Sequence, residues 1–160
     1  MITMEYRDAC ELLDADHIAV KHLFVGYARL AVAPDSPDAV NRLDIAMKIC
    51  DELSVHAQIE EEIFYPALRE ALPADGDLLD EAEEEHAQAK ALIAQIREAG
   101  AASAEVDDLV ARLNRAIEHH VKEERDELFP KARTAPGMDL VALRDQLRQR
   151  QQELVSMTAA

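Results

Sequence analysis

Two segments, HAQIEEEIFYP (residues 56–66) and HHVKEERDELFP (residues 119–130), carry the same pattern. In each, a His is followed four residues later by a Glu and ten residues later by a Pro: His56, Glu60 and Pro66, then His120, Glu124 and Pro130. Residues four apart lie one turn apart on the same face of an α-helix. The repeat therefore predicts two helices that each present an imidazole beside a carboxylate. A helical bundle can hold two metal ions between side chains of these kinds.

Composition and turn signals predict an all-α fold. Only four of the 160 residues are Gly and none is Trp, which favours helices over a turn-rich β fold. The loop signals are PDSPD (34–38), PADGD (73–77), AGAAS (99–103) and TAPGM (134–138). They separate helical patterns over 4–32, 37–71, 77–99, 104–129 and 139–157. Short loops between long helices predict an antiparallel up-down-up-down four-helix bundle with an additional C-terminal helix.

Local signals predict where some helices begin and end. Asp35 or Ser36 before a proline suits a helix start, as does Ser103, and Gly100 suits a helix end.

The repeated prolines are expected to kink or end the second and fourth helices. Both Pro66 and Pro130 lie late in those patterns, and proline lacks the N–H that an α-helix interior requires.

The bundle is expected to occupy residues 1–133, and a separate helix residues 134–160. This last segment carries four leucines at helical spacing: Leu140, Leu143, Leu147 and Leu154. They predict a helix that either packs along the outside of the bundle or joins copies of the chain into a homo-oligomer.

Charge and hydropathy exclude several classes of partner. The 33 acidic residues exceed the 17 basic ones, for a net charge of −16, which disfavours nucleic acid and anionic membranes. No stretch approaches the ~18 apolar residues of a transmembrane helix, and the N-terminus lacks the features of a signal peptide. Cys10 and Cys50 are expected to lie roughly 20 Å apart, too far for a disulfide. A reduced, cytoplasmic protein is predicted.

Each predicted bundle helix places one His on its apolar face. At 100° per residue, Glu60 and Glu124 fall on the apolar stripe of their helices, and so do His17, His56, His86 and His120. His22 and His119 fall off the stripe and are predicted on the surface. The Glu-rich runs EEEIF and EAEEEH are expected to be mostly solvated faces.

The joint pattern favours a metal centre. A lone core His is usually held by hydrogen bonds, and a His–Glu pair is often a surface ion pair. Two buried carboxylates without partners, however, are strongly destabilising. A metal centre relieves this penalty because its ligands are carboxylate anions and neutral imidazoles.

The six predicted ligands, His17, His56, Glu60, His86, His120 and Glu124, are too many for one tetrahedral zinc and fit a dinuclear centre. Carboxylate with imidazole suits iron, manganese or zinc. The absence of thiolates near the seam argues against a Cys-rich zinc site or an iron–sulfur cluster. Ferritin-like proteins repeat Glu-x-x-His, whereas the repeated element here has the opposite order, His-x-x-x-Glu.

The order of these residues resembles the bacterial hemerythrin-like proteins, also called HHE cation-binding domains. The phrases that carry the resemblance are LLDADHIAVKHLF, ELSVHAQIEEEIFYPAL, EAEEEHAQAKALI and HHVKEERDELFPKA, and the resemblance covers residues 6–133. It implies a non-haem di-iron centre with an oxo or hydroxo bridge inside a four-helix bundle. The four histidines would be terminal ligands, and Glu60 and Glu124 would bridge the irons.

The chain departs from oxygen-carrying hemerythrin on the third helix. That family member has two histidines four residues apart there, whereas here Lys90 follows His86 at that spacing and Ala82 precedes it. One terminal ligand is missing, and a solvent molecule or Glu83 would take its place. The gap argues against reversible oxygen carriage and leaves room for zinc or manganese in a purified sample.

The predicted function is a binding or sensing module whose di-iron centre engages O2, peroxide or NO. The alternatives are a di-iron enzyme that decomposes peroxide or handles NO, and an iron-handling protein whose acidic surface attracts cations. The sequence does not decide whether the chain is an enzyme, and it predicts no catalytic residue beyond the metal ligands.

Substitutions test the predicted facing directions. Glu60→Ala or His120→Ala is expected to abolish binding of two metal ions, measured by metal analysis, because each removes a core-facing ligand. His22→Ala and His119→Ala are expected to leave binding intact. Loss of metal in His119→Ala, with binding retained in His120→Ala, would reverse the assignment of the fourth helix.

Overall fold

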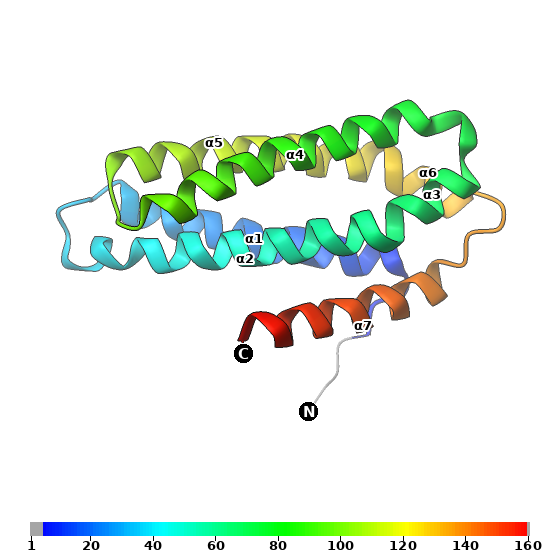
Figure 1. Cartoon of the computed structure of the whole chain (residues 1–160), viewed down its shortest axis with the longest axis horizontal. Helices are drawn as coiled ribbons and strands as arrows, with labels where there is room; N and C mark the ends of the chain where they lie inside the picture. The colour runs from blue at the N-terminus through cyan, green and yellow to red at the C-terminus, as the bar shows by residue number, and fades with distance from the viewer. Residues whose placement is uncertain (1–4, 160) are drawn as a thin grey trace.

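The computed structural model describes residues 5–159, and all regular elements within that range are helical (Figure 1). The all-α prediction is confirmed. The predicted start of the first helix, at residue 4, lies outside the described residues. Residues 1–3 and 160, which belong to the predicted domain ranges, lie outside them as well.

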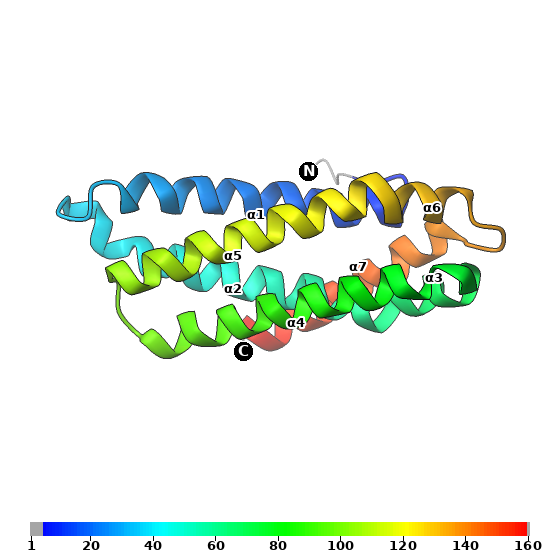
Figure 2. The same ribbon diagram turned by 90° about the horizontal axis from the view of Figure 1, so that it is seen from above.

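The helices that precede α7 form long columns that lie side by side along the length of the molecule (Figures 1 and 2). The first is α1 (Ala9–Ala31) and the third is α4 (Gly76–Ala99). The second is composed of α2 (Arg42–Ile59), η2 (Glu60–Phe64) and α3 (Tyr65–Ala71). The fourth is composed of α5 (Ala104–Glu123), η4 (Glu124–Leu128) and α6 (Phe129–Thr134). Successive columns alternate in direction, and α1 packs on α2 while α4 packs on α5.

Capping side chains set several helix ends. Ser103 caps α5 by accepting a hydrogen bond from the Val106 N–H, and Gly100 ends α4 with a positive φ of 69°, as predicted. The α1 helix begins later than expected because the Asp8 side chain caps it, accepting from the Glu11 N–H. The helix predicted from residue 37 begins as a 3-10 turn, η1 (Pro37–Asn41). A second 3-10 turn, η3 (Pro73–Asp75), precedes α4.

The repeated prolines do not end their helices. Pro66 and Pro130 lie in the first turns of α3 and α6, and the chain stays helical through both. Each follows a π-helical turn, η2 or η4, that begins at Glu60 or Glu124, whose carbonyl accepts from the N–H five residues later. This wider turn shifts the hydrogen-bond ladder just before a residue that has no N–H and would crowd the carbonyl four positions back.

The apolar core is divided into two clusters along the bundle. One contains Leu13, Ile59 and Leu128, and the other contains Phe24, Ile49 and Leu113. In each column the histidine predicted to face inward lies between the residues of the two clusters. The polar residues therefore form a layer across the middle of the core.

The C-terminal helix α7 (Leu140–Ala159) packs against α1, α2 and η2 (Figure 1). Leu143, Leu147 and Leu154 are buried in the first core cluster, and Leu140 packs partly buried against it. These leucines face the bundle of the same chain.

Two other sequence predictions have structural counterparts. Cys10 and Cys50 are both buried and free. Within residues 5–159, none of the helices combines the length and the apolar character needed to cross a bilayer.

Candidate metal centre

The structure gathers the six predicted ligands into one buried layer. Glu60 and Glu124 are 0% exposed, and the histidines are between 4% and 7% exposed: His17, His56, His86 and His120. The layer draws on all four columns: α1, the α2–η2 junction, α4 and the α5–η4 junction.

The four imidazoles form two pairs, one for each pair of packed columns. The Nε2 atoms of His17 and His56 are 3.2 Å apart, and those of His86 and His120 are 3.1 Å apart. Each pair thus directs its Nε2 atoms toward a common point.

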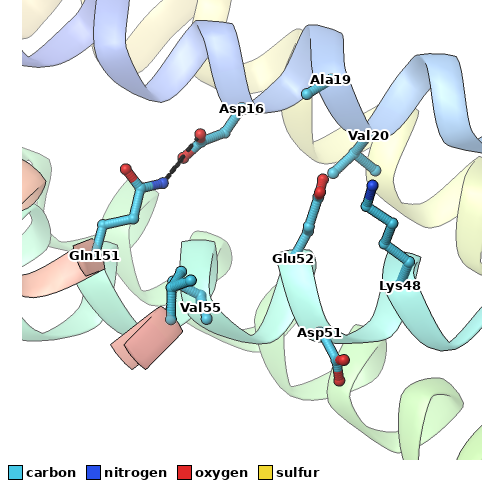
Figure 3. A pocket seen from close by; sticks show the side chains of 9 residues that line it. Asp16, Ala19, Val20, Lys48, Asp51, Glu52, Val55 and Gln151 are labelled. Atoms are coloured by element: carbon cyan, nitrogen blue, oxygen red, sulfur yellow. Dashed lines mark hydrogen bonds between the residues drawn. The ribbon is translucent and has the colours of Figure 1, made fainter. Parts of the chain in front are cut away.

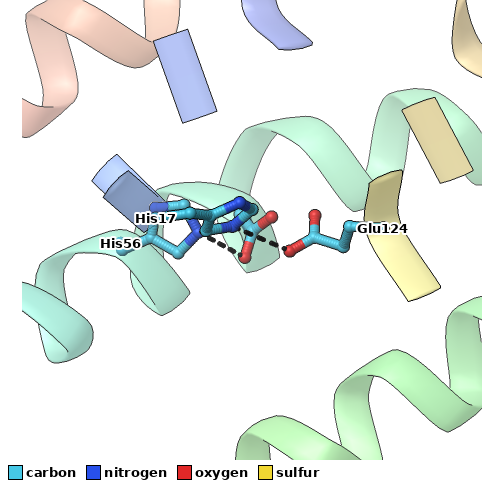
Figure 4. A group of neighbouring side chains, drawn as sticks. His17, His56 and Glu124 are labelled. Carbon is cyan, nitrogen blue, oxygen red and sulfur yellow. Dashed lines mark hydrogen bonds and ion pairs between the residues drawn. The ribbon is translucent and has the colours of Figure 1, made fainter. Parts of the chain in front are cut away.

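The two carboxylates span both imidazole pairs. Glu60 Oε1 lies 3.1 Å from His56 Nε2 and 3.2 Å from His86 Nε2. Glu124 Oε1 lies 2.8 Å from His120 Nε2 and 3.4 Å from His17 Nε2. Figure 4 shows Glu124 directed toward the His17–His56 pair.

Within this layer, two groups of side chains bring possible metal-ligand atoms within 4.8 Å of one another. The first contains His17, His56, Glu60 and Glu124, and the second contains Glu60, His86 and His120. Because Glu60 belongs to both, the groups are adjacent halves of one dinuclear arrangement.

A second layer of carboxylates holds the other ring nitrogen of every imidazole. The Nδ1 atoms of His17 and His56 contact Asp14 at 3.1 Å and Asp16 at 2.9 Å. Those of His86 and His120 contact Glu61 at 3.2 Å and Glu85 at 2.8 Å. An ionised carboxylate can only accept, so each Nδ1 donates its proton. In a neutral imidazole this leaves the Nε2 lone pair to face inward, the orientation that a metal ligand requires.

The donor set fits a pair of metal cations. All four oxygens of Glu60 and Glu124 are buried without a hydrogen-bond partner among the described residues, since their close contacts with imidazole nitrogens lack hydrogen-bond geometry. By contrast, the buried charge of Arg42 is paired with Asp107 at 2.8 Å. Two neutral imidazoles would also repel where their Nε2 lone pairs face each other. A proton or a metal cation shared within the layer relieves both problems.

In the metal-free protein, protons fill this role. Burial by itself would lower the pKa of His56 and of His120. Glu60, together with Asp16, outweighs it at His56 and raises that pKa well above its usual value. Glu124, together with Glu60 and Glu85, outweighs it at His120 and raises that pKa to about 12. Burial would likewise raise the pKa of Glu60, and the charge of His56 instead lowers it well below its usual range. Glu60 thus remains anionic beside the protonated His56, and a bound metal would displace such an imidazolium proton.

Tyr65 is a residue of this layer that the sequence patterns did not single out. Its hydroxyl is fully buried and lies 3.2 Å from His86 Nε2 and 3.3 Å from His120 Nε2. It therefore faces the His86–His120 pair on α4 and α5. Burial, reinforced by the charges of Glu124 and Glu60, raises its pKa well above the usual value.

The remaining candidates lie outside the layer. His22 and His119 are exposed, as predicted, with His119 close to Glu85 and Glu123. Glu83, considered as a substitute ligand, is exposed and pairs with Arg69 at 3.1 Å. The structure therefore does not bring it to the centre.

Sequence reasoning also missed the second carboxylate layer. Glu61 and Glu85 belong to runs expected to be mostly solvated, and Asp16 shows no local relation to the His56 that it contacts. The only local signal was the spacing of three between Asp14 and His17. One further regularity is visible afterwards: Asp16, Glu61 and Glu85 each adjoin a predicted ligand in the chain while contacting an imidazole of another helix.

Comparison with known proteins agrees with this geometry. The family model described as Hemerythrin HHE cation binding domain matches residues 8–132. The chain belongs to the hemerythrin HHE family. Membership in this family, together with the buried His and Glu groups, supports metal binding.

A solved structure shares the fold of this HHE chain. The crystal structure of a hemerythrin HHE cation binding domain-containing protein from Mycobacterium kansasii superposes with a TM-score of 0.72. The alignment covers 95% of this chain and 90% of the other, at 22% identity. At that identity the likeness is one of fold.

A curated relative matches a shorter part of the HHE chain. A DNA nickase from Nostoc sp. is 33% identical over 82 residues, which are 51% of this chain and 23% of the relative. The chain therefore spans less than a quarter of that protein.

The second carboxylate layer leads to a test. Glu85→Gln is expected to weaken zinc binding by about 10- to 100-fold, because a neutral amide supports the His120 Nδ1–H less well than a carboxylate. Competition with a chromogenic chelator measures the affinity. Glu84→Gln, an exposed change one residue earlier in α4, is the matched control and should bind like wild type. Equal affinities for all three proteins would contradict a role for the Glu85 contact.

Proposed function

We propose that this HHE chain is a non-haem di-iron protein that binds or senses O2, NO or peroxide. Its centre is carboxylate-bridged and lies within an antiparallel up-down-up-down four-helix bundle. The contacts of Glu60 and Glu124 with one imidazole of each pair support this proposal most directly. If each carboxylate is a ligand of both cations, six side chains provide four ligands to each cation.

The proposed ligand set follows the two groups. His17 and His56 would hold one iron, His86 and His120 the other, and Glu60 and Glu124 would bridge them. Bound iron would supply redox equivalents and coordination positions to a small ligand. The four outer carboxylates keep the Nδ1 protons in place, so that the Nε2 lone pairs stay directed inward.

Tyr65 would complete the second group. Its hydroxyl lies 3.2 Å from His86 Nε2 and 3.3 Å from His120 Nε2, beside the pair that has one imidazole fewer than the family resemblance implies. The burial and negative charge that raise its pKa in the metal-free protein are offset by a nearby dication, which favours the phenolate. Tyr65 thus offers an anionic ligand where Glu83 does not.

A small apolar cavity beside the imidazoles supports the proposal that the ligand is a small molecule. It measures about 30 Å³ and borders all four imidazoles, with Leu53, Ala57, Ile93 and Ile117 among its walls. A single water needs about 10–15 Å³ of such space, so the cavity has room for about two non-hydrogen atoms. Its size and apolar walls suit O2 or NO and exclude larger substrates.

We propose that residues 134–160 extend the bundle rather than form an association surface, because the leucines of α7 are buried against it. Nucleic acid is not a proposed partner. The net charge of −16 opposes binding to phosphate backbones, and the match to the DNA nickase covers 23% of that protein.

Metal analysis with absorption spectroscopy tests the function. After aerobic, iron-supplied expression, two irons per chain and the bands of an oxo-bridged pair are expected. A reversible spectral change on adding and removing O2 or NO would support binding or sensing. Steady peroxide turnover far above that of free iron would instead favour the enzyme alternative, and loss and reloading of iron on mild reduction the iron-handling one. A well-folded chain that takes up no metal would refute the proposal.

Tyr65→Phe tests the proposed oxygen ligand. The iron-loaded wild type is expected to show a phenolate-to-iron charge-transfer band, which the variant loses while retaining two irons. Tyr27→Phe is the control, because Tyr27 belongs to the other core cluster, where its hydroxyl donates a hydrogen bond to Asp107 at 2.6 Å. Identical spectra for wild type and Tyr65→Phe would show that Tyr65 is not a ligand and that solvent takes the additional ligand position of the second group.

A further inference from the structure

Each carboxylate that holds an imidazole Nδ1 has a further partner of its own. Arg125 contacts Asp14 at 2.6 Å, Lys90 contacts Glu61 at 2.7 Å, and His119 contacts Glu85 at 3.1 Å. These three partners come from the bundle and are cationic or ionisable. The fourth carboxylate, Asp16, is different.

The partner of Asp16 is an uncharged amide on the C-terminal helix. Gln151 of α7 donates from Nε2 to Asp16 Oδ1 at 3.1 Å and to Oδ2 at 3.2 Å. Figure 3 shows this contact at one side of a cleft of about 510 Å³ bounded by α1, α2 and α7. Asp16 in turn accepts from His56 Nδ1 at 2.9 Å. A continuous chain of contacts therefore runs from α7 to the imidazole layer.

The position of Gln151 on α7 is held by its neighbours. Leu147 and Leu154, one turn before and nearly one turn after it, are buried in the core. Arg150, the preceding residue, contacts Glu62 of η2 at 2.8 Å. The Gln151 amide thus projects from a fixed backbone toward a carboxylate that is itself a quarter exposed.

We propose that Gln151 is a positioning residue through which α7 orients Asp16 and, through it, His56. The inference rests on the proposed ligand role of His56. Because the amide bonds to both carboxylate oxygens without adding a charge, it restrains Asp16 while leaving its negative charge to the imidazole. Among the described residues, no lysine or arginine makes an ion pair with Asp16. His56 therefore faces a carboxylate that, unlike Asp14 and Glu61, is not shared with a cation.

The test removes the amide while keeping the length of the side chain. Gln151→Met preserves packing against α1, and Gln152→Met, at an exposed position next to it, is the matched control. Asp16→Asn and the double variant, which combines Asp16→Asn with Gln151→Met, complete a double-mutant cycle. The readouts are solvent exchange of the His56 Nδ1 proton in metal-free protein, followed by NMR, and zinc affinity by chelator competition.

In Gln151→Met, faster exchange of the His56 Nδ1 proton is expected, with zinc affinity weakened by up to about tenfold. Asp16→Asn should fall in the about 10- to 100-fold range of outer-layer partners. The double variant should bind like Asp16→Asn alone, because Gln151 acts through Asp16. Gln152→Met should match wild type in both readouts.

Other outcomes overturn the inference. Additive losses in the double variant would show that Gln151 does not act through Asp16. A lowered melting temperature in Gln151→Met with unchanged exchange and zinc affinity would show a purely structural role. If wild type bound no zinc while Gln151→Met still changed the exchange of His56, the proposed metal function would fail and the α7–Asp16–His56 linkage would stand.

Discussion

Two fully buried carboxylates, Glu60 and Glu124, impose the constraint on which the rest of the structure depends. A carboxylate in a dry core is strongly unfavourable unless positive charge lies beside it. Elsewhere in the bundle, the buried charge of Arg42 is compensated by an ion pair with Asp107. Here positive charge comes from the neighbouring imidazoles, because the carboxylates around them raise the pKa values of His17, His56 and His120 despite burial. The same rings are available as ligands when a cation replaces those protons. This polar layer divides the apolar core into two clusters, so hydrophobic packing on both sides holds it in place.

The backbone is adapted to this layer at both carboxylates. The π turns η2 and η4 each begin at a glutamate that spans the imidazole pairs, and each is followed by a proline. The widened turn accommodates a residue without an N–H and lets the helix continue. The His–Glu–Pro repeat thus reflects both the chemistry of the ligands and the local helix geometry.

Around the imidazoles, the side chains form successive layers that link the columns. Three of the four carboxylates at Nδ1 belong to a different column from the imidazole they hold, so helix packing and imidazole orientation depend on each other. The contact from Gln151 brings α7 into the same arrangement. Although α7 lies outside the four columns, it is linked to the imidazole layer because the Gln151 amide bonds to Asp16, which in turn contacts His56.

The sequence by itself determined the all-α class and the six inward-facing residues, because helical periodicity and i, i+4 spacing are local properties. The resemblance to the family was carried by four phrases of the sequence around these residues. It also located the Gly100 and Ser103 helix ends, whereas the start of α1 depended on the Asp8 cap. It could not show which imidazoles pair, that Glu61 and Glu85 turn inward from acidic runs, or that Tyr65 faces the His86–His120 pair. Those relations depend on the relative rotation and axial register of the helices. Only the tertiary structure decides these, because packing of the two core clusters sets how far each helix is turned and shifted against its neighbours.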